Sequence, residues 1–150
     1  MIDIDGIKEL IPHRYPFLLV DRVNDYKKDE YIIAYKNITA SEEVFQGHFP
    51  DYPIYPGVMV IEGLAQTGAM LAFLSLENHT PEMIKDMVVY FMSIDKAKFR
   101  NPVRPGDKLE YHVKALKKKG SIWIVEGKAI VDDKVVAEAE LKAMISKKRD

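Results

Sequence analysis

One segment dictates most of the architecture: residues 45–77, FQGHFPDYPIYPGVMVIEGLAQTGAMLAFLSLE. Its first part contains three prolines, Pro50, Pro53 and Pro56. Each proline lacks an N–H and pushes the preceding residue out of the α region, so this part is predicted to be a fixed, irregular loop that carries His48. From position 58 onward the residues are mostly apolar and include no proline, which predicts a long helix that begins at Gly57.

The predicted helix, residues 58–77, is apolar on nearly every side and would be about 30 Å long. Such a helix is either buried in a protein core or spans a membrane. Glu62 and Gln66 are polar and four residues apart, so they share one face, which favours a buried central helix. Because His48 lies in the loop that feeds the start of this helix, we expect an imidazole, a carboxyl group and a helix N-terminus to lie together.

The composition fits a single domain over residues 1–150, since 47% of the residues are hydrophobic and can form a full core. The absence of cysteine excludes disulfides, thiolate metal sites and a cysteine nucleophile. Lys and Arg number 22 against 23 Asp and Glu, so the total charge indicates neither a nucleic acid nor an anionic membrane as partner. The first residues lack the apolar region of a signal peptide, so we expect a cytoplasmic protein.

The rest of the chain predicts a short helix and an antiparallel sheet. Asp5 is expected to cap a helix over residues 6–11, which Pro12 ends. Strands are predicted for residues 17–26, 31–38, 87–100, 108–118, 121–131 and 134–145. Short turns between them make the sheet antiparallel. The predicted fold class is therefore α+β, with about six strands wrapped round the long helix, because nothing else can cover it.

Two groups of motifs resemble a known enzyme family. They are PHRYPFLLVDRV at 12–23, GHFP at 47–50, Pro53, Pro56-Gly57-Val58, Glu62 and Ala65-Gln66, and then Phe99-Arg100, Pro102-Val103 and Pro105-Gly106-Asp107. Together they resemble the β-hydroxyacyl-acyl carrier protein dehydratases of the FabZ type over essentially the whole chain. The resemblance implies a hot-dog fold, in which an antiparallel sheet curls round the long helix. It also implies a homodimer that assembles further into a hexamer, a trimer of dimers.

The resemblance implies dehydration of a (3R)-hydroxyacyl chain on acyl carrier protein to the trans-2-enoyl product, in fatty acid biosynthesis and without a cofactor. This reaction needs a base for the C2 proton, an acid for the leaving hydroxyl and donors for the enolate oxygen. An imidazole is a suitable base at neutral pH, and the resemblance assigns that role to His48. The backbone N–H of Gly57, at the positive end of the helix, is placed to polarise the thioester carbonyl.

Glu62 is the predicted acid. A glutamic acid serves at neutral pH only where an apolar lining raises its pKa from about 4.3. The neighbours Val58, Ile61 and Leu64 predict such a lining. The resemblance implies that this glutamate reaches the site from the second subunit of the dimer. Gln66, one turn beyond, is predicted to orient the carboxyl group, since a buried amide needs a partner.

The acyl chain needs an apolar channel. The resemblance points to five lining residues: Phe49, Ile54, Phe73, Val89 and Tyr90. Tyr90 is the candidate gate of this channel. For Phe73 and Val89, simple packing in the core is nearly as good an interpretation.

A basic run consists of Lys96, Lys98, Arg100 and Arg104. Strand alternation would place the first three on one side of the sheet, where like charges repel unless an anionic partner arrives. Such runs are usually solvated faces. Because acyl carrier proteins are strongly acidic, this run is the predicted docking site.

The other histidines receive structural interpretations. His79 is expected to cap the end of the long helix, and His112 to lie on the wet face of its strand. His13 is expected to hydrogen-bond within its loop, and the alternative is that it lines the site. No pair of histidines has metal-ligand spacing, so no metal site is predicted.

Three alternative functions stay open. A hot-dog thioesterase would activate water with a helix carboxylate, and a non-catalytic module would only bind the acyl chain. A related dehydratase-isomerase also moves the double bond, but that family typically has Asp at the acid position, where this chain has Glu62.

Overall fold

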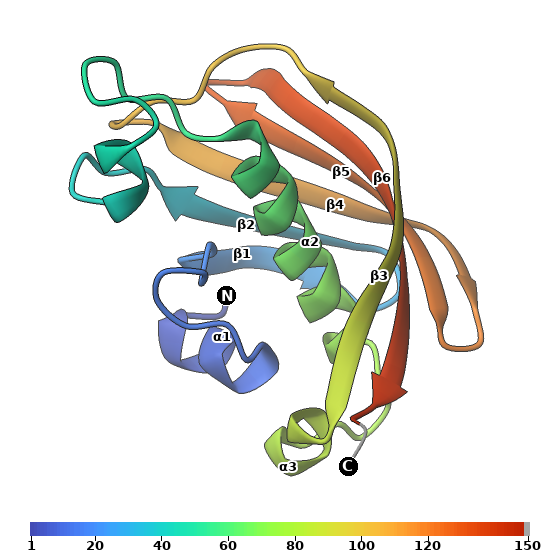
Figure 1. The fold of residues 1–150 in the computed structure, drawn as a ribbon. Helices are drawn as coiled ribbons and strands as arrows, with labels where there is room; N and C mark the ends of the chain where they lie inside the picture. The colour runs from blue at the N-terminus through green and yellow to red at the C-terminus, as the bar shows by residue number, and fades with distance from the viewer. Residues whose placement is uncertain (149–150) are drawn as a thin grey trace.

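The computed structural model describes residues 1–148. One antiparallel sheet contains six strands in the order β1-β2-β4-β5-β6-β3. The strands are β1 (Arg22–Lys27), β2 (Tyr31–Asn37), β3 (Met87–Phe99), β4 (Lys108–Lys119), β5 (Ile122–Val131) and β6 (Lys134–Lys147). The helices are α1 (Ile4–Leu10), the 3₁₀ helix η1 (Glu43–Gln46), α2 (Gly57–Leu74) and α3 (Pro81–Lys85). The sheet curves round α2, as Figure 1 shows, and the expected six-stranded wrap is confirmed.

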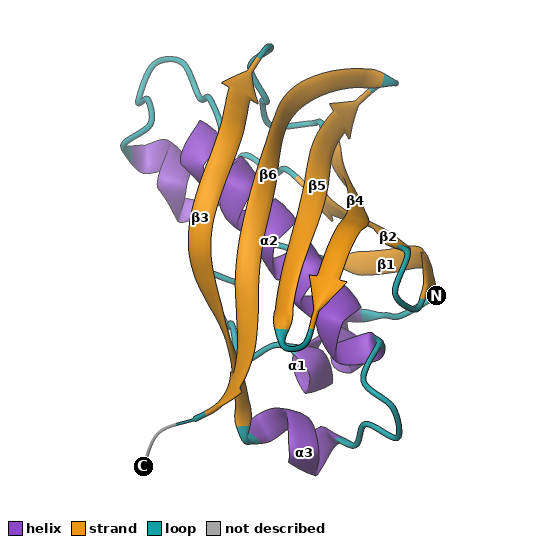
Figure 2. Cartoon of the chain, turned by 90° about the vertical axis from the view of Figure 1, so that its right-hand side faces the viewer, coloured by secondary structure: helices purple, strands orange, loops and turns teal. Residues whose placement is uncertain are grey.

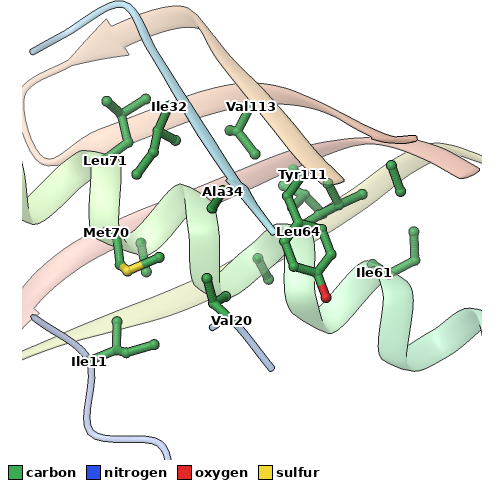
Figure 3. Packing of buried hydrophobic residues seen from close by; sticks show 14 of the residues in the cluster. Ile11, Val20, Ile32, Ala34, Ile61, Leu64, Met70, Leu71, Tyr111 and Val113 are labelled. Atoms are coloured by element: carbon green, nitrogen blue, oxygen red, sulfur yellow. The ribbon is translucent and has the colours of Figure 1, made fainter. Parts of the chain in front are cut away.

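Helix α2 crosses the concave face of the sheet (Figure 2). Every residue from Gly63 to its end is buried, and Leu64, Met70 and Leu71 are fully enclosed. In Figure 3, Leu71 lies beside Ile32 and Leu64 beside Tyr111, whereas Met70 lies on the side of the helix that faces Ile11. Each fully buried aliphatic side chain contributes about 1.5–3 kcal/mol. The helix is long and apolar enough to cross a membrane, but it is mostly buried and forms the core of this fold.

Helix α2 ends at Leu74, three residues before the predicted end. The Ser75 hydroxyl donates to Leu71 O at 2.7 Å and accepts from Asp29 N at 2.9 Å. This hydroxyl ties the end of the helix to the β1–β2 turn, so the chain leaves the helix there. Helix α3 was not predicted, although Thr80 caps it and Pro81 occupies its first turn, which are ordinary signals of a helix start.

Two predicted boundaries near the N-terminus are wrong. Asp3, not Asp5, caps α1, because its carboxylate accepts Gly6 N at 3.1 Å. The first strand begins at Arg22 rather than at position 17. The backbone groups of residues 17 and 19, which would otherwise pair with a neighbouring strand, hydrogen-bond to Gln66 of α2 instead. The Gln66 amide donates to Phe17 O at 2.7 Å and accepts Leu19 N at 3.0 Å.

Strand β3 is irregular near its end. The register shifts between Asp95 and Lys98, and Lys96 has a φ of +54°. Such a bulge adds a residue to one strand and breaks the alternation of its faces. Regular alternation therefore does not extend through this segment, although Lys96 and Arg100 still reach glutamates on one face of β6, Glu140 and Glu138.

Replacing Gly63 with alanine should destabilise the fold by about 1–3 kcal/mol, because a methyl group there would collide with the Tyr111 hydroxyl. Tyr111 is fully buried and donates to Leu19 O at 2.9 Å, so it cannot move without breaking that bond. Gly68→Ala is the matched control, since its methyl group would meet Val125 at an ordinary 3.5 Å. Chemical denaturation should show a loss for Gly63→Ala and none for Gly68→Ala; equal midpoints would contradict the packing described here.

Candidate active site

His48 lies in the loop between η1 and α2, and its ring has one defined tautomer. Its Nδ1 is 2.7 Å from Ile54 O, and Ile54 N in turn donates to His48 O at 3.1 Å. A carbonyl oxygen only accepts, so the proton of the neutral ring lies on Nδ1 and Nε2 is left bare. The ring also stacks on Phe49, with centroids 4.1 Å apart. The loop therefore presents an unprotonated nitrogen in a fixed orientation.

Arg104, in the connection between β3 and β4, contacts this loop directly. Its Nε donates to Pro53 O at 3.2 Å, and its guanidinium lies 4.2 Å from the centre of the Tyr52 ring. Tyr55 N donates to Val103 O at 2.7 Å and joins the same segments. Arg104, predicted to dock a carrier, is thus engaged in holding the loop that carries His48.

Gly57 is the first residue of α2, and its N–H makes no hydrogen bond within residues 1–148. The Phe99 ring lies against it, so that a Cβ on this glycine would be 2.7 Å from the ring. Gly57 and Phe99 line a hollow of about 480 Å³ together with Ile54, Val58 and Val103. The Gly57 N–H thus lies at the positive end of the helix dipole and beside an apolar hollow. A residue larger than glycine at position 57 would block that hollow.

Glu62 faces the loop of residues 13–19 and not His48. Its Oε1 accepts Gln66 Nε2 at 3.0 Å and lies 3.5 Å from His13 Nε2. No hydrogen bond or ion pair joins Glu62 to His48 in the part of the chain that is described. The carboxyl side chain is also 41% exposed, so the predicted apolar lining is not supplied by its own chain. The imidazole and carboxyl group expected together are separate within one subunit.

Gln66 contacts Glu62 as the sequence predicted, and it is only 1% exposed. The same amide fixes the backbone at Phe17 and Leu19, so all of its polar atoms have partners. Gln66 therefore holds the carboxyl group and the adjacent loop in one arrangement.

His13 differs from its prediction, because its ring makes no hydrogen bond within its loop. Its Nδ1 is buried and has no partner in the described chain, and its Nε2 faces Glu62. Burial lowers the pKa of His13, while Glu62 raises it to a smaller extent and Arg14 lowers it. The spacing of the sequence does not identify this contact, because His13 and Glu62 are 49 positions apart and meet only in the folded chain.

His112 is partly exposed beside Glu110 on the outer face of β4, as expected. The predicted cap by His79 is wrong, because Ser75 is the C-cap of α2 and the His79 ring contacts Leu76 O, beyond the helix, at 3.1 Å.

Within residues 1–148, the five predicted channel residues lie in different places. Phe73 is 3% exposed and belongs to the packed core, so its interpretation as core packing holds. Val89 borders a space of only about 10 Å³, while Ile54 lines the separate hollow beside Gly57. Phe49 and Tyr90 lie at the surface. Ile54 lies beside the start of α2 at Gly57, whereas Val89 of β3 borders Ala69 and Ala72 further along the helix, so the two are apart.

Two of the predicted docking cations already have acidic partners. Lys96 Nζ is 3.5 Å from Glu140, and Arg100 is 3.2 Å from Glu138. The hydrogen bond from Arg100 lowers the pKa of the Glu138 carboxyl. The prediction of repelling, unpaired cations is therefore wrong for these two, because β6 presents a glutamate to each. Lys98 has no ion-pair partner among residues 1–148.

The family model that matches this chain is that of the FabA-like domain, over residues 11–140. A relative from Nitratiruptor, named 3-hydroxyacyl-[acyl-carrier-protein] dehydratase FabZ, is 65% identical over 97% of this chain and 98% of its own length. This chain belongs to the FabZ dehydratase family. Another FabZ, from Wolinella succinogenes, is 63% identical over 99% of this chain and 98% of its own.

Solved structures extend the likeness of this FabZ-family chain at the level of the fold. The dehydratase heterocomplex ApeI:P from Xenorhabdus doucetiae matches with a TM-score of 0.76 and 15% identity, over 95% of this chain and 91% of that one. The thioesterase HI1161 from Haemophilus influenzae matches with a TM-score of 0.70 and 13% identity, over 98% and 92% of the two chains. The expected hot-dog fold is confirmed.

Proposed function

We propose that His48 is the base and Glu62 the acid of a dehydration reaction. This chain is a 3-hydroxyacyl-[acyl-carrier-protein] dehydratase of fatty acid biosynthesis, a lyase that removes water from the (3R)-hydroxyacyl chain and leaves the trans-2-enoyl product. The observation that carries the residue assignment is the bond from His48 Nδ1 to Ile54 O, which leaves Nε2 free to accept a proton. We place the reaction in the cytoplasm.

We propose the following proton transfers. His48 Nε2 takes a proton from C2, and the electron pair forms an enolate whose oxygen the Gly57 N–H stabilises. Glu62 gives its proton to the C3 hydroxyl, the C3–O bond breaks, and water leaves as the C2–C3 double bond forms. Solvent then returns a proton from His48 to Glu62, which restores both groups.

We infer that a second copy of the chain completes the site. One subunit separates His48 from Glu62, and Glu62 remains partly exposed, so a carboxyl group for His48 must come from elsewhere. Strand β3 pairs only with β6 in the described chain and exposes a row of apolar side chains: Tyr90, Phe91, Met92, Ile94 and Phe99. A free apolar edge of this kind favours pairing with another strand.

The position of β3 supports the shared site, because Phe99 at its end also lines the hollow beside Gly57. A partner on this edge would therefore lie next to the proposed catalytic groups. We further propose that three such dimers form the hexamer that the family resemblance implies. Sedimentation of the wild-type protein should give the mass of six chains; the mass of two would restrict the proposal to the dimer.

A spectrophotometric assay tests the function directly. The wild-type protein should hydrate a trans-2-butenoyl thioester, the reverse reaction, with loss of the enoyl absorbance and no release of thiol. Thiol release without hydration would identify a thioesterase, and binding without either change would identify a non-catalytic module. Conversion of the trans-2 product to a cis-3 isomer would reveal a dehydratase-isomerase.

We propose that acyl carrier protein docks at the basic run, with Lys98 as its most available cation. Lys98→Glu should reduce kcat/KM on carrier-bound substrate by roughly tenfold and weaken its salt dependence, since steering charges act mainly on association. Turnover of a short thioester without the carrier should stay at the wild-type value. Lys117→Glu, a charge reversal on the distant β4–β5 hairpin, is the control. Equal losses on both substrates would show that Lys98 supports the fold or site instead.

A further inference from the structure

His13 has features that the assigned chemistry does not use. It sits in the loop of residues 13–19, partly buried, and no role follows from the dehydration steps above. Its Nδ1 is enclosed without a partner in the described chain, whereas its Nε2 is directed at the carboxyl group of Glu62. Buried polar atoms without partners are rare and indicate a constraint at that position.

The contacts to Glu62 distinguish its two oxygens. Gln66 Nε2 lies 3.0 Å from Oε1, and His13 Nε2 lies 3.5 Å from the same oxygen. The second distance is at the outer edge of hydrogen bonding, and such contacts tighten when a substrate complex forms. Oε2 makes no hydrogen bond in residues 1–148. Oε1 thus accepts one hydrogen bond, from Gln66, and has the His13 ring as its second polar neighbour, whereas Oε2 has neither.

The protonation state of His13 also follows from its surroundings. A neutral ring with its proton on Nε2 leaves a bare nitrogen at the enclosed Nδ1, whereas a protonated ring would bury an N–H without an acceptor. Burial also lowers the pKa of His13, which favours the neutral ring. The charged groups that act on this ring in the described chain are Glu62 of α2 and Arg14 of its own loop, with opposite effects. The guanidinium of Arg14 is held by backbone oxygens, including Ile11 O at 3.0 Å.

We infer that neutral His13 is a positioning residue, which together with Gln66 occupies Oε1 of Glu62 with N–H donors and so directs the transferable proton to Oε2. The inference rests on the proposed role of Glu62 as the acid. A donor N–H facing Oε1 disfavours a proton on that oxygen, so the proton of the neutral acid is on the oxygen that is open to substrate. A neutral donor also avoids fixing Glu62 as a carboxylate, which a cation at this distance would do.

Three variants of His13 separate positioning from simple packing. His13→Gln places an amide N–H near the position of Nε2, His13→Asn keeps a polar amide that is too short to reach Glu62, and His13→Leu removes the donor. We expect Asn and Leu to lower kcat by about tenfold, the order of one hydrogen bond, with KM within twofold of wild type. Gln should restore kcat to within about threefold of wild type.

The pH profile of kcat supplies a readout that packing alone would not change. In a reaction that needs a protonated acid, loss of that proton sets the alkaline limb of the profile. Loss of a donor to the carboxylate should move this limb to higher pH in His13→Asn and His13→Leu, and His13→Gln should keep it in place. His112→Leu, on the outer face of β4, is the control and should leave both kcat and the limb unchanged. Thermal denaturation of each variant identifies losses that come from unfolding.

The outcomes are distinguishable from failure of the proposed function. If Glu62→Gln is as active as wild type, the acid assignment fails and the inference with it. If Glu62→Gln is inactive while His13→Asn, folded, keeps wild-type kcat and an unmoved limb, only the role of His13 is overturned. If His13→Leu does not fold, the comparison of Asn with Gln decides, since both amides are polar and only one reaches the carboxyl group.

Discussion

Replacing His48 with alanine is expected to lower kcat for dehydration by about 10²–10⁴, the contribution of a general base. The imidazole is held by Ile54 O with its free nitrogen outward, and no neighbouring group replaces that nitrogen in the described chain. The fold should survive, because His48 lies in a loop outside the buried core. The measurement is the steady-state rate on carrier-bound substrate, with thermal denaturation of the same sample.

The control is His79→Ala, which removes another loop histidine bonded to a backbone oxygen, Leu76 O. It should keep wild-type turnover. A His48→Ala enzyme that is folded and within tenfold of wild type would show that the C2 proton goes to a different group.

Most of the fold could be predicted because the strongest signals are local and periodic. The prolines before Gly57 forced a loop, and the apolar run after it forced a buried helix, which the structure confirms at Gly57–Leu74. Alternation likewise identified β4, where Leu109, Tyr111 and Val113 are buried against α2. Local sequence patterns determine which face of an element is apolar, and the sheet then wraps the only helix that needs covering.

The predictions of strand boundaries and alternation were wrong where contacts with residues far away in the sequence override the local pattern. Gln66 took the hydrogen bonds of residues 17–19 and delayed the first strand, which no pattern within that segment reveals. A bulge at Lys96 interrupts the regular alternation of β3, and glutamates on β6 pair with Lys96 and Arg100. Such contacts depend on the tertiary structure and leave no periodic signal in the sequence.

The candidate site was predictable in its residue types but not in its arrangement. His48, Glu62 and Gly57 came from the resemblance and the chemistry of dehydration, and the structure adds the tautomer of His48. Sequence spacing suggested that His48 and Glu62 meet at one helix end, whereas Glu62 faces His13 and Gln66. Whether His48 and Glu62 meet within one chain depends on the direction of each side chain, which the spacing of the sequence does not give. The proposed contribution of a second subunit cannot be read from the sequence of one chain.

The largest recovery of activity is expected when two inactive variants are mixed. Glu62→Gln keeps the size and polarity of the side chain but cannot donate a carboxylic proton, so it should be as inactive as His48→Ala. In a dimer that contains one chain of each, one site combines the intact His48 with the partner's intact Glu62, and the other site has neither. Random pairing makes half of the dimers mixed with one of two sites restored, so about a quarter of wild-type activity should return.

Complementation in verified mixed dimers is therefore the most direct measurement of the shared site. The two variants, carrying different affinity tags, are unfolded and refolded together, and the doubly tagged oligomer is isolated and assayed on carrier-bound substrate. We expect about a quarter of the wild-type rate from a hexamer, in which about half of the dimer units are mixed, and about half from a simple dimer, in which one of the two sites is intact. A doubly tagged oligomer that is no more active than either variant alone would contradict the shared site and would mean that the acid for His48 lies in its own chain.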